Sequence, residues 1–164
     1  MDARTGALIL YWETMNIDNL FHYVNLFHSA ILETKNELSI DFHFFPTGSC
    51  RTTCTLLGTF LIQKGFCDLI IQIGEKYYLK NNYEQEYTHA WLKAKNSLII
   101  DITAYQFPEI SEKIIIQETP LWYNSWTIVE EISDFNIFNI ASTTSLDIIN
   151  YETIITKIQQ LEEI

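Results

Sequence analysis

The chain has 164 residues, of which 48% are hydrophobic and 14% aromatic, and this apolar content is enough for one compact domain with a substantial core. Ten Lys and Arg residues against 21 Asp and Glu residues give a formal charge of −11, which repels nucleic-acid phosphates and anionic membrane surfaces. We therefore expect neither nucleic acid nor membrane as a partner. The dispersed acidic residues are typical of a solvated surface, although an acidic groove for a basic protein partner is an open alternative.

The sequence contains no apolar run of membrane-spanning length, and its first residues, "MDARTGALILYWETMNIDNL", lack the basic, apolar and small-residue order of a signal peptide. These features predict a soluble cytoplasmic protein, or an effector that is secreted without a Sec signal.

Apolar residues recur at three- and four-residue steps between Tyr11 and about Lys35, which predicts an amphipathic helix. The segment 38–46, "LSIDFHFFP", alternates like a short strand or an extended lead-in. Pro46 and Gly48 then break the chain into a turn.

The next segment, "SCRTTCTLLGTFLIQKG", predicts a second helix. Ser49 is its expected N-cap, and Gly65 supplies the C-terminal stop. Cys50 therefore falls in the first helical turn, where unpaired backbone N–H groups and the helix dipole stabilise a thiolate. Cys54, one turn further along, gains less from both effects and lies on the apolar face.

The rest of the chain predicts mainly antiparallel strands and a final helix. A β-branched strand (67–79) is followed by a polar loop (80–87), a hairpin (88–107) that turns near 95–96, further strand or extended segments (112–118 and 122–132) and a helix from about Ser145. This order predicts a single α+β domain spanning residues 1–164.

An odd number of cysteines, Cys50, Cys54 and Cys67, argues against a disulfide framework in a chain without a secretory signal. Cys50 and Cys54 could bind zinc together with His43 and His89, but the chain contains neither paired C-x-x-C knuckles nor H-E-x-x-H. We expect no metal and no cofactor. A catalytic or a buried structural role for Cys50 is left.

A turn formed by residues 94–96 would place His89 and Asp101 opposite each other across the predicted hairpin, with both side chains on one face. A carboxylate that orients an imidazole creates the base needed to activate a nucleophile. Cys50, His89 and Asp101 are therefore the candidate catalytic residues. The alternative is that His89 caps a strand while Asp101 binds a loop.

Four further residues are candidates for contact with a substrate. Trp91 can form a cleft wall or belong to the core, and Gln106 can supply an amide donor to an oxyanion or be an ordinary loop residue. Ser49 and Arg51 flank the cysteine, and Arg51 can favour its thiolate. The cluster Trp122, Tyr123 and Trp126 is read as core packing, with a recognition surface as the alternative.

Three motifs in this order carry a resemblance: "FPTGSC" with "LLGTFLIQKG", then "HAWL", then "LIIDITAYQF". Together they resemble a family of bacterial papain-like or transglutaminase-like cysteine hydrolases with the patterns F-P-x-G-x-C, H-A-W-L and D-I-T-A-x-Q-F. The Cys–His–Asp order is also similar to that of arylamine N-acetyltransferases, transglutaminases and glutamine-deamidating bacterial toxins. The resemblance covers about Phe45 to Phe107, under half of the chain.

The resemblance implies a papain-like (transglutaminase-like) core in which Cys50 is the nucleophile, His89 the general base and Asp101 its orienting carboxylate. The family pattern often continues after the cysteine with Gly-Asp and has a serine four residues on, whereas this chain has Arg51, Thr52 and Cys54. This departure affects the surroundings of the nucleophile.

The residues and the resemblance together predict a thiol-dependent acyl-transfer enzyme of amidase, protease or glutamine deamidase type that acts on an amide of a protein or peptide. The alternative is a catalytically silent papain-like domain that binds a protein as an inhibitor or immunity factor. The two differ in the reactivity that they predict for Cys50.

Overall fold

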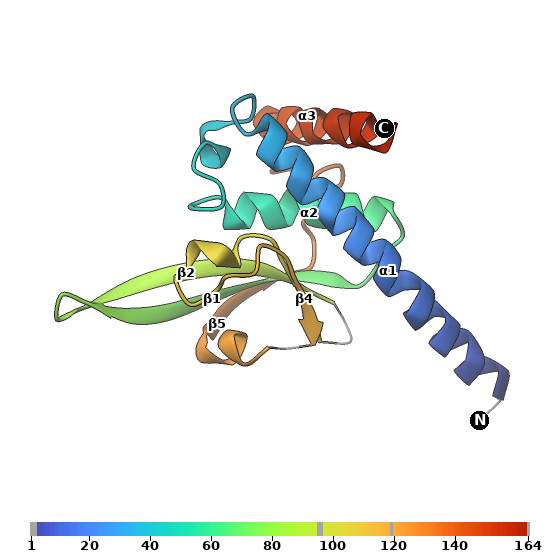
Figure 1. Ribbon diagram of the computed structural model, residues 1–164, viewed down its shortest axis with the longest axis horizontal. Coiled ribbons are helices and arrows are strands. Elements are labelled where there is room, and N and C mark those ends of the chain that lie inside the picture. The colour runs from blue at the N-terminus through green and yellow to red at the C-terminus, as the bar shows by residue number, and fades with distance from the viewer. Residues whose placement is uncertain (1–2, 95–96, 119, 164) are drawn as a thin grey trace.

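The computed structural model describes residues 3–94, 97–118 and 120–163, and within these ranges it combines three α-helices with a five-stranded antiparallel sheet (Figure 1). The helices are α1 (Ala3–Thr34), α2 (Cys50–Gln63) and α3 (Ser145–Glu162). The strands are β1 (Leu69–Lys80), β2 (Tyr83–Ala94), β3 (Leu98–Asp101), β4 (Ile115–Glu118) and β5 (Thr127–Ile132), in the spatial order β4-β3-β2-β1-β5. The predicted α+β class is confirmed.

Helix α2 lies against one face of the sheet, and α1 and α3 pack together on the side of α2 that is away from the sheet (Figure 1). The buried residues of α2 include Leu56, Leu57 and Leu61, at most 1% exposed each. Gly65 ends this helical segment as expected, since its φ of 93° allows the Phe66 N–H to reach the Leu61 carbonyl at 3.0 Å.

Gly58, in the middle of α2, allows the helix to approach the sheet closely. A Cβ atom at this position would overlap the ring of Phe135 and would lie 3.1 Å from Cδ2 of Leu92 on β2. The absence of a side chain therefore sets how near α2, with Cys50 at its first residue, comes to the strand that carries His89.

Strands β1 and β2 form a long hairpin that extends beyond the helices (Figure 1). The prediction of a loop over residues 80–87 is wrong, because only Asn81 and Asn82, with φ values of 53° and 64°, form the turn. Two consecutive positive φ values match the twist of the flanking strands, so the polar residues that follow stay in register with β1.

Two further segments differ from their prediction as strand or extended structure. Residues Ile40–Phe42 form a short 3-10 helix, and buried Phe42 and Phe45 both reach the core at three-residue spacing. Residues Leu121–Ser125 form another 3-10 helix, η3, and strand β5 begins only after Trp126. In both cases the aromatic residues serve packing, not strand pairing.

The terminal helix agrees with its prediction. The Thr144 hydroxyl accepts from the Asp147 N–H at 3.1 Å, and Asp147 in turn accepts from the Thr144 N–H, so a capping box starts α3 one residue before Ser145. No helix in the described part of the chain is both long and apolar enough to cross a lipid bilayer.

The two faces of the sheet bury different residues. The face toward α2 is aliphatic and includes Ile71, Leu92 and Ile100. The opposite face carries a second cluster that is largely aromatic: Trp91, Ile99, Ala104, Phe107, Ile115, Tyr123 and Trp126. His89 contacts this aromatic cluster, which therefore surrounds the candidate site.

Candidate active site

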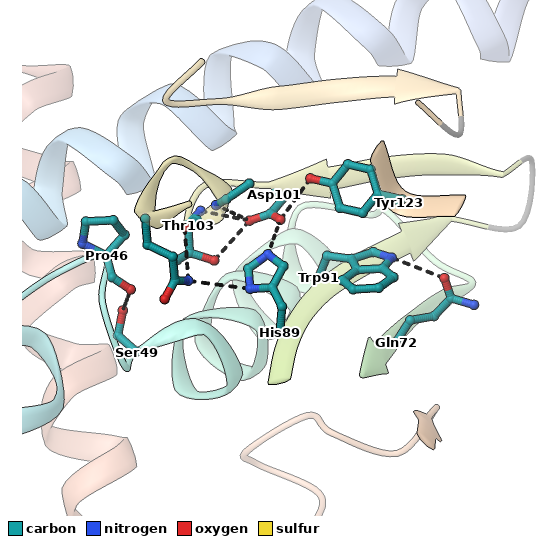
Figure 2. A network of polar contacts seen from close by, with 10 residues as sticks. Pro46, Ser49, Gln72, His89, Trp91, Asp101, Thr103 and Tyr123 are labelled. Atoms are coloured by element: carbon teal, nitrogen blue, oxygen red, sulfur yellow. Dashed lines mark hydrogen bonds and ion pairs between the residues drawn. The ribbon is translucent and has the colours of Figure 1, made fainter. Parts of the chain in front are cut away.

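His89 of β2 and Asp101 of β3 form a buried pair (Figure 2). Nε2 of His89 lies 2.6 Å from Oδ2 of Asp101, and the two side chains are 0% and 1% exposed. The structure thus brings together the two residues that the sequence paired, and their separation from water strengthens the interaction.

The register of the two strands differs from the predicted one. Leu92 pairs with Ile100 and Lys93 with Ile99, so continuing the ladder places Asp101 opposite Trp91 and makes its contact with His89 diagonal. The difference is two residues, an even number, so both side chains keep the same face of the sheet. The residues predicted for the turn, 95–96, lie outside the described ranges.

The Asp101 carboxylate accepts hydrogen bonds on both oxygens. Besides His89, Oδ2 accepts from the Tyr123 hydroxyl at 2.9 Å. Oδ1 accepts from the backbone N–H of Thr103 at 2.8 Å, from its hydroxyl at 2.9 Å and from the backbone N–H of Ala104 at 3.1 Å. Burial by itself raises the pKa of Asp101, but His89 and these donors outweigh it and hold the pKa below its usual value.

The His89 imidazole is held in its charged form. Burial alone lowers its pKa, but the charge and hydrogen bond of Asp101, helped by Cys50, raise the pKa to about 9. The ring is therefore an imidazolium at neutral pH. It is enclosed by aromatic rings at centroid distances of 5.1 to 5.9 Å: Phe107, Trp126, Trp91 and Trp122.

Cys50, the first residue of α2, is half-buried and interacts with His89. Burial raises the pKa of its thiol, but the hydrogen bond and charge of His89 and the backbone N–H of Ala90 outweigh burial, so the pKa is lowered overall. Three separate elements, α2, β2 and β3, thus contribute the three predicted catalytic residues to one place.

Gln106 lies beside the same ring. Its side-chain nitrogen is 3.4 Å from Nδ1 of His89 and donates to the Thr103 carbonyl at 3.1 Å. Both nitrogens of His89 consequently have polar neighbours, with Asp101 at one and Gln106 at the other. The half-buried amide of Gln106 can reach a group bound at the imidazole.

The other predicted substrate-binding residues lie elsewhere. Trp91 is 1% exposed and its indole N–H donates to Gln72 at 3.1 Å, so it is a core residue beneath His89 and not a cleft wall (Figure 2). Ser49 is 0% exposed and its hydroxyl donates to the Pro46 carbonyl at 3.0 Å, so its side chain neither caps α2 nor faces a substrate.

Arg51 is exposed and points to the sheet. Its guanidinium lies 3.6 Å from Glu130 of β5. The groups that lower the pKa of Cys50 are His89 and the Ala90 N–H, so the structure assigns the predicted stabilisation of the thiolate to them and not to Arg51.

Two residues that hold Asp101 were missed in the sequence. Thr103, two residues after Asp101, follows the spacing at which an aspartate binds a nearby backbone N–H, and this signal was available. Tyr123 arrives from η3, 22 residues after Asp101, and nothing in the local sequence indicates that contact.

Within the described residues, no group of three or more His, Cys, Asp or Glu side chains is arranged to hold a metal ion. Comparisons with models of protein families, with curated proteins and with solved structures found no match to this chain. The chemistry of the site is therefore the basis for inferring a function.

Proposed function

We propose that the protein is a thiol-dependent acyl-transfer enzyme, of amidase, protease or glutamine deamidase type, that acts on an amide of a protein or peptide. The observation that carries the proposal is the contact between Cys50 and His89, in which the thiol pKa is lowered and the imidazole pKa is raised to about 9. Opposite shifts in one contact favour a thiolate beside an imidazolium, which is the nucleophilic form of such a pair.

The proposed reaction begins when the Cys50 sulfur attacks the carbonyl carbon of the amide. The carbonyl π electrons move to oxygen, and in this proposal the first-turn N–H groups of α2 and the Gln106 amide stabilise that oxyanion. His89 gives its proton to the departing nitrogen, and the C–N bond breaks to leave a thioester on Cys50.

The second half of the reaction returns the enzyme to its starting state. Neutral His89 takes a proton from water, the hydroxide attacks the thioester carbonyl, and the C–S bond breaks to release a carboxylic acid and regenerate the thiolate. An amine in place of water would give transfer instead of hydrolysis by the same steps. Asp101 keeps the imidazole oriented and stabilises its charged form throughout.

We further propose that the core is papain-like or transglutaminase-like. Support comes from the arrangement of the three residues, with a cysteine at the start of a helix, a histidine on an antiparallel strand and an aspartate on the next strand. The motifs "FPTGSC", "HAWL" and "DITAYQF" occur at the same three places.

Alkylation of the native protein with iodoacetamide from about pH 5 to 9, with mapping of the modified cysteine, tests the activated thiol directly. We expect rapid modification of Cys50 at mildly acidic pH. Release of ammonia or of a new amino terminus from glutamine-containing peptides and from casein then tests amide cleavage. A Cys50 that is not labelled, or whose labelling midpoint is that of a free thiol, would instead favour the silent protein-binding domain.

A further inference from the structure

The hairpin β1–β2 changes character along its length. Near its base, the pair Ile73 and Ala90 is buried beneath α2, with exposed fractions of 8% and 1%. Beyond that pair the hairpin continues past the helices, and its tip projects freely (Figure 1). The face that was covered at the base is therefore left open along the outer half.

The open face consists of three cross-strand pairs: Glu75 with Thr88, Tyr77 with Glu86, and Leu79 with Glu84. Tyr77 and Leu79 are 59% and 74% exposed. We call these six residues the acidic hairpin face, since it carries three carboxylates and no Lys, Arg or His.

The two lysines of β1 occupy the other face of the hairpin, and so does Lys93 near the base of β2. Lys76 and Lys80 alternate with the acidic face along β1, and the Lys76 ammonium lies 4.7 Å from the ring centroid of Tyr78 over the aromatic cluster. Charge is therefore segregated between the two faces of one hairpin.

The carboxylates act together on the acidic hairpin face. The Tyr77 hydroxyl donates to Glu86 at 2.9 Å, and Glu86 first, then Glu75 and Glu84, raise the pKa of Tyr77. A single phenol thus responds to all three charges. A cation that settles beside Tyr77 would interact with the same three carboxylates.

This face leads directly to the candidate nucleophile. On the same face, the pair that follows Glu75 and Thr88 toward the base of the hairpin is Ile73 with Ala90. The Ala90 N–H interacts with the Cys50 thiol. A polypeptide lying along the open face would therefore arrive at Cys50, where α2 begins.

We propose that the acidic hairpin face binds a basic, extended segment of the polypeptide substrate and guides the adjoining amide to Cys50. The proposal rests on the proposed function for its catalytic part only. Lys or Arg side chains of the segment pair with Glu75, Glu84 and Glu86, and an apolar side chain packs against Tyr77 and Leu79. The face extends for roughly 13 Å along the strands, the length of about five extended residues.

Binding is measured first by fluorescence anisotropy, with a labelled short peptide in which arginine alternates with leucine and glycine. A matched peptide with glutamate in place of arginine is the ligand control. The test variant is the triple substitution Glu75→Gln, Glu84→Gln and Glu86→Gln. Its control is Glu152→Gln, Glu162→Gln and Glu163→Gln, which removes the same charge from exposed positions in and after α3.

We expect the hairpin variant to weaken binding of the arginine peptide by at least about tenfold, and the α3 variant by less than about twofold. Equal losses would overturn the proposal, because they would show attraction by net charge alone. Failure of the unmodified protein to bind this peptide would overturn it as well. So would a dimer that Leu79→Ser dissociates, because a second copy would then cover the face.

A second measurement tests the direction of the bound segment without requiring turnover. The arginine peptide carries a terminal chloroacetamide, and its alkylation rate at Cys50 is divided by the rate with free chloroacetamide. We expect this ratio to fall in the hairpin variant and to persist in the α3 variant. A ratio near one in the unmodified protein would overturn guidance to Cys50. Normal peptide binding and a high ratio in a protein that cleaves no amide would refute the proposed enzyme while leaving the docking face supported.

Discussion

Cys50 and Cys54 lie one turn apart on α2, and their surroundings have opposite effects on them. Cys54 is 4% exposed, and burial raises the pKa of its thiol well above the usual value. At Cys50 the same effect of burial is outweighed by His89 and by the Ala90 N–H, so the pKa is lowered. Contact with His89 at the helix start, and not the residue type, therefore distinguishes the thiol whose pKa is lowered from the one whose pKa is raised.

The strongest test replaces each of the two cysteines with alanine in a separate variant. Cys50→Ala should reduce amide turnover by about 10⁴-fold or more, because it removes the atom that attacks the carbonyl. Cys54→Ala should leave most of the turnover. Initial rates of both purified proteins on the same peptide measure the contrast, and comparable losses in the two would contradict the assignment of Cys50.

The difference between the thiols should shrink when His89 is replaced. His89→Gln removes the positive charge and its hydrogen bond to the sulfur, while burial of Cys50 remains. The midpoint of iodoacetamide labelling should therefore rise. Rates between about pH 5 and 9 for both proteins measure this. An unchanged midpoint would mean that His89 does not activate the thiol.

The charge of the His89–Asp101 pair should also be visible in stability. The folded pKa of His89 is about 9 against an ordinary value of 6.5, so its contribution is fully present below pH 6.5 and is lost as pH rises through about 9. This loss should amount to about 3 kcal/mol at most. Urea unfolding of Cys50→Ala protein, in which no thiol titrates at this position, measures the part of this loss that Asp101 causes, since Cys50 also contributes to the raised pKa of His89.

Asp101→Asn in the same Cys50→Ala background is the matched control. The amide keeps the shape of the carboxylate but removes the charge that raises the His89 pKa, so the loss of stability between pH 6.5 and about 9 should largely disappear. Equal pH dependence in the two proteins would show that another group is responsible.

Tyr123 should influence Cys50 without touching it. Its hydroxyl donates to Asp101 at 2.9 Å, so Tyr123→Phe leaves the carboxylate with one donor fewer and should cost about 1.5 to 3 kcal/mol of folding free energy. The labelling midpoint of Cys50 should also move, because Asp101 sets the charge of His89. A loss of stability with an unchanged pH profile would assign Tyr123 a packing role only.

The smallest expected effect belongs to Cys54 itself. Replacing its buried sulfur with hydrogen in Cys54→Ala should destabilise the fold by about 1 kcal/mol, the scale for deleting a small buried group. Thermal unfolding of Cys54→Ala beside Cys50→Ala measures the difference. A larger stability loss at Cys50 than at Cys54 would reverse the comparison.

Short-range signals made much of the site predictable. Ser49 and Gly65 bracket a helix with Cys50 at its start, and strand parity places His89 and Asp101 on one face. The predicted register was wrong by two residues, but a shift by an even number leaves His89 and Asp101 on the same face of the sheet. The loop predicted over 80–87 failed because Asn81 and Asn82 turn the chain alone, and polar strand residues then resemble a loop.

Long-range packing was not predictable in the same way. Trp91 alternates like a residue of a half-exposed strand, but η3 covers that face and places Tyr123 at a ring-centroid distance of 5.0 Å. Burial of Trp91, and the hydrogen bond from Tyr123 to Asp101, both depend on where η3 folds back. No local pattern records that position, since it results from the path of the chain after β4.

The close approach allowed by Gly58 makes one helix position as intolerant of substitution as the proposed nucleophile. Any side chain there would push α2 off Leu92 and Phe135 and carry Cys50 away from His89. Selection for the proposed thiol chemistry should therefore also preserve the glycine eight positions after Cys50, although glycine is otherwise disfavoured in a helix interior. Cysteine and glycine at this spacing form a signature by which distant relatives can be sought.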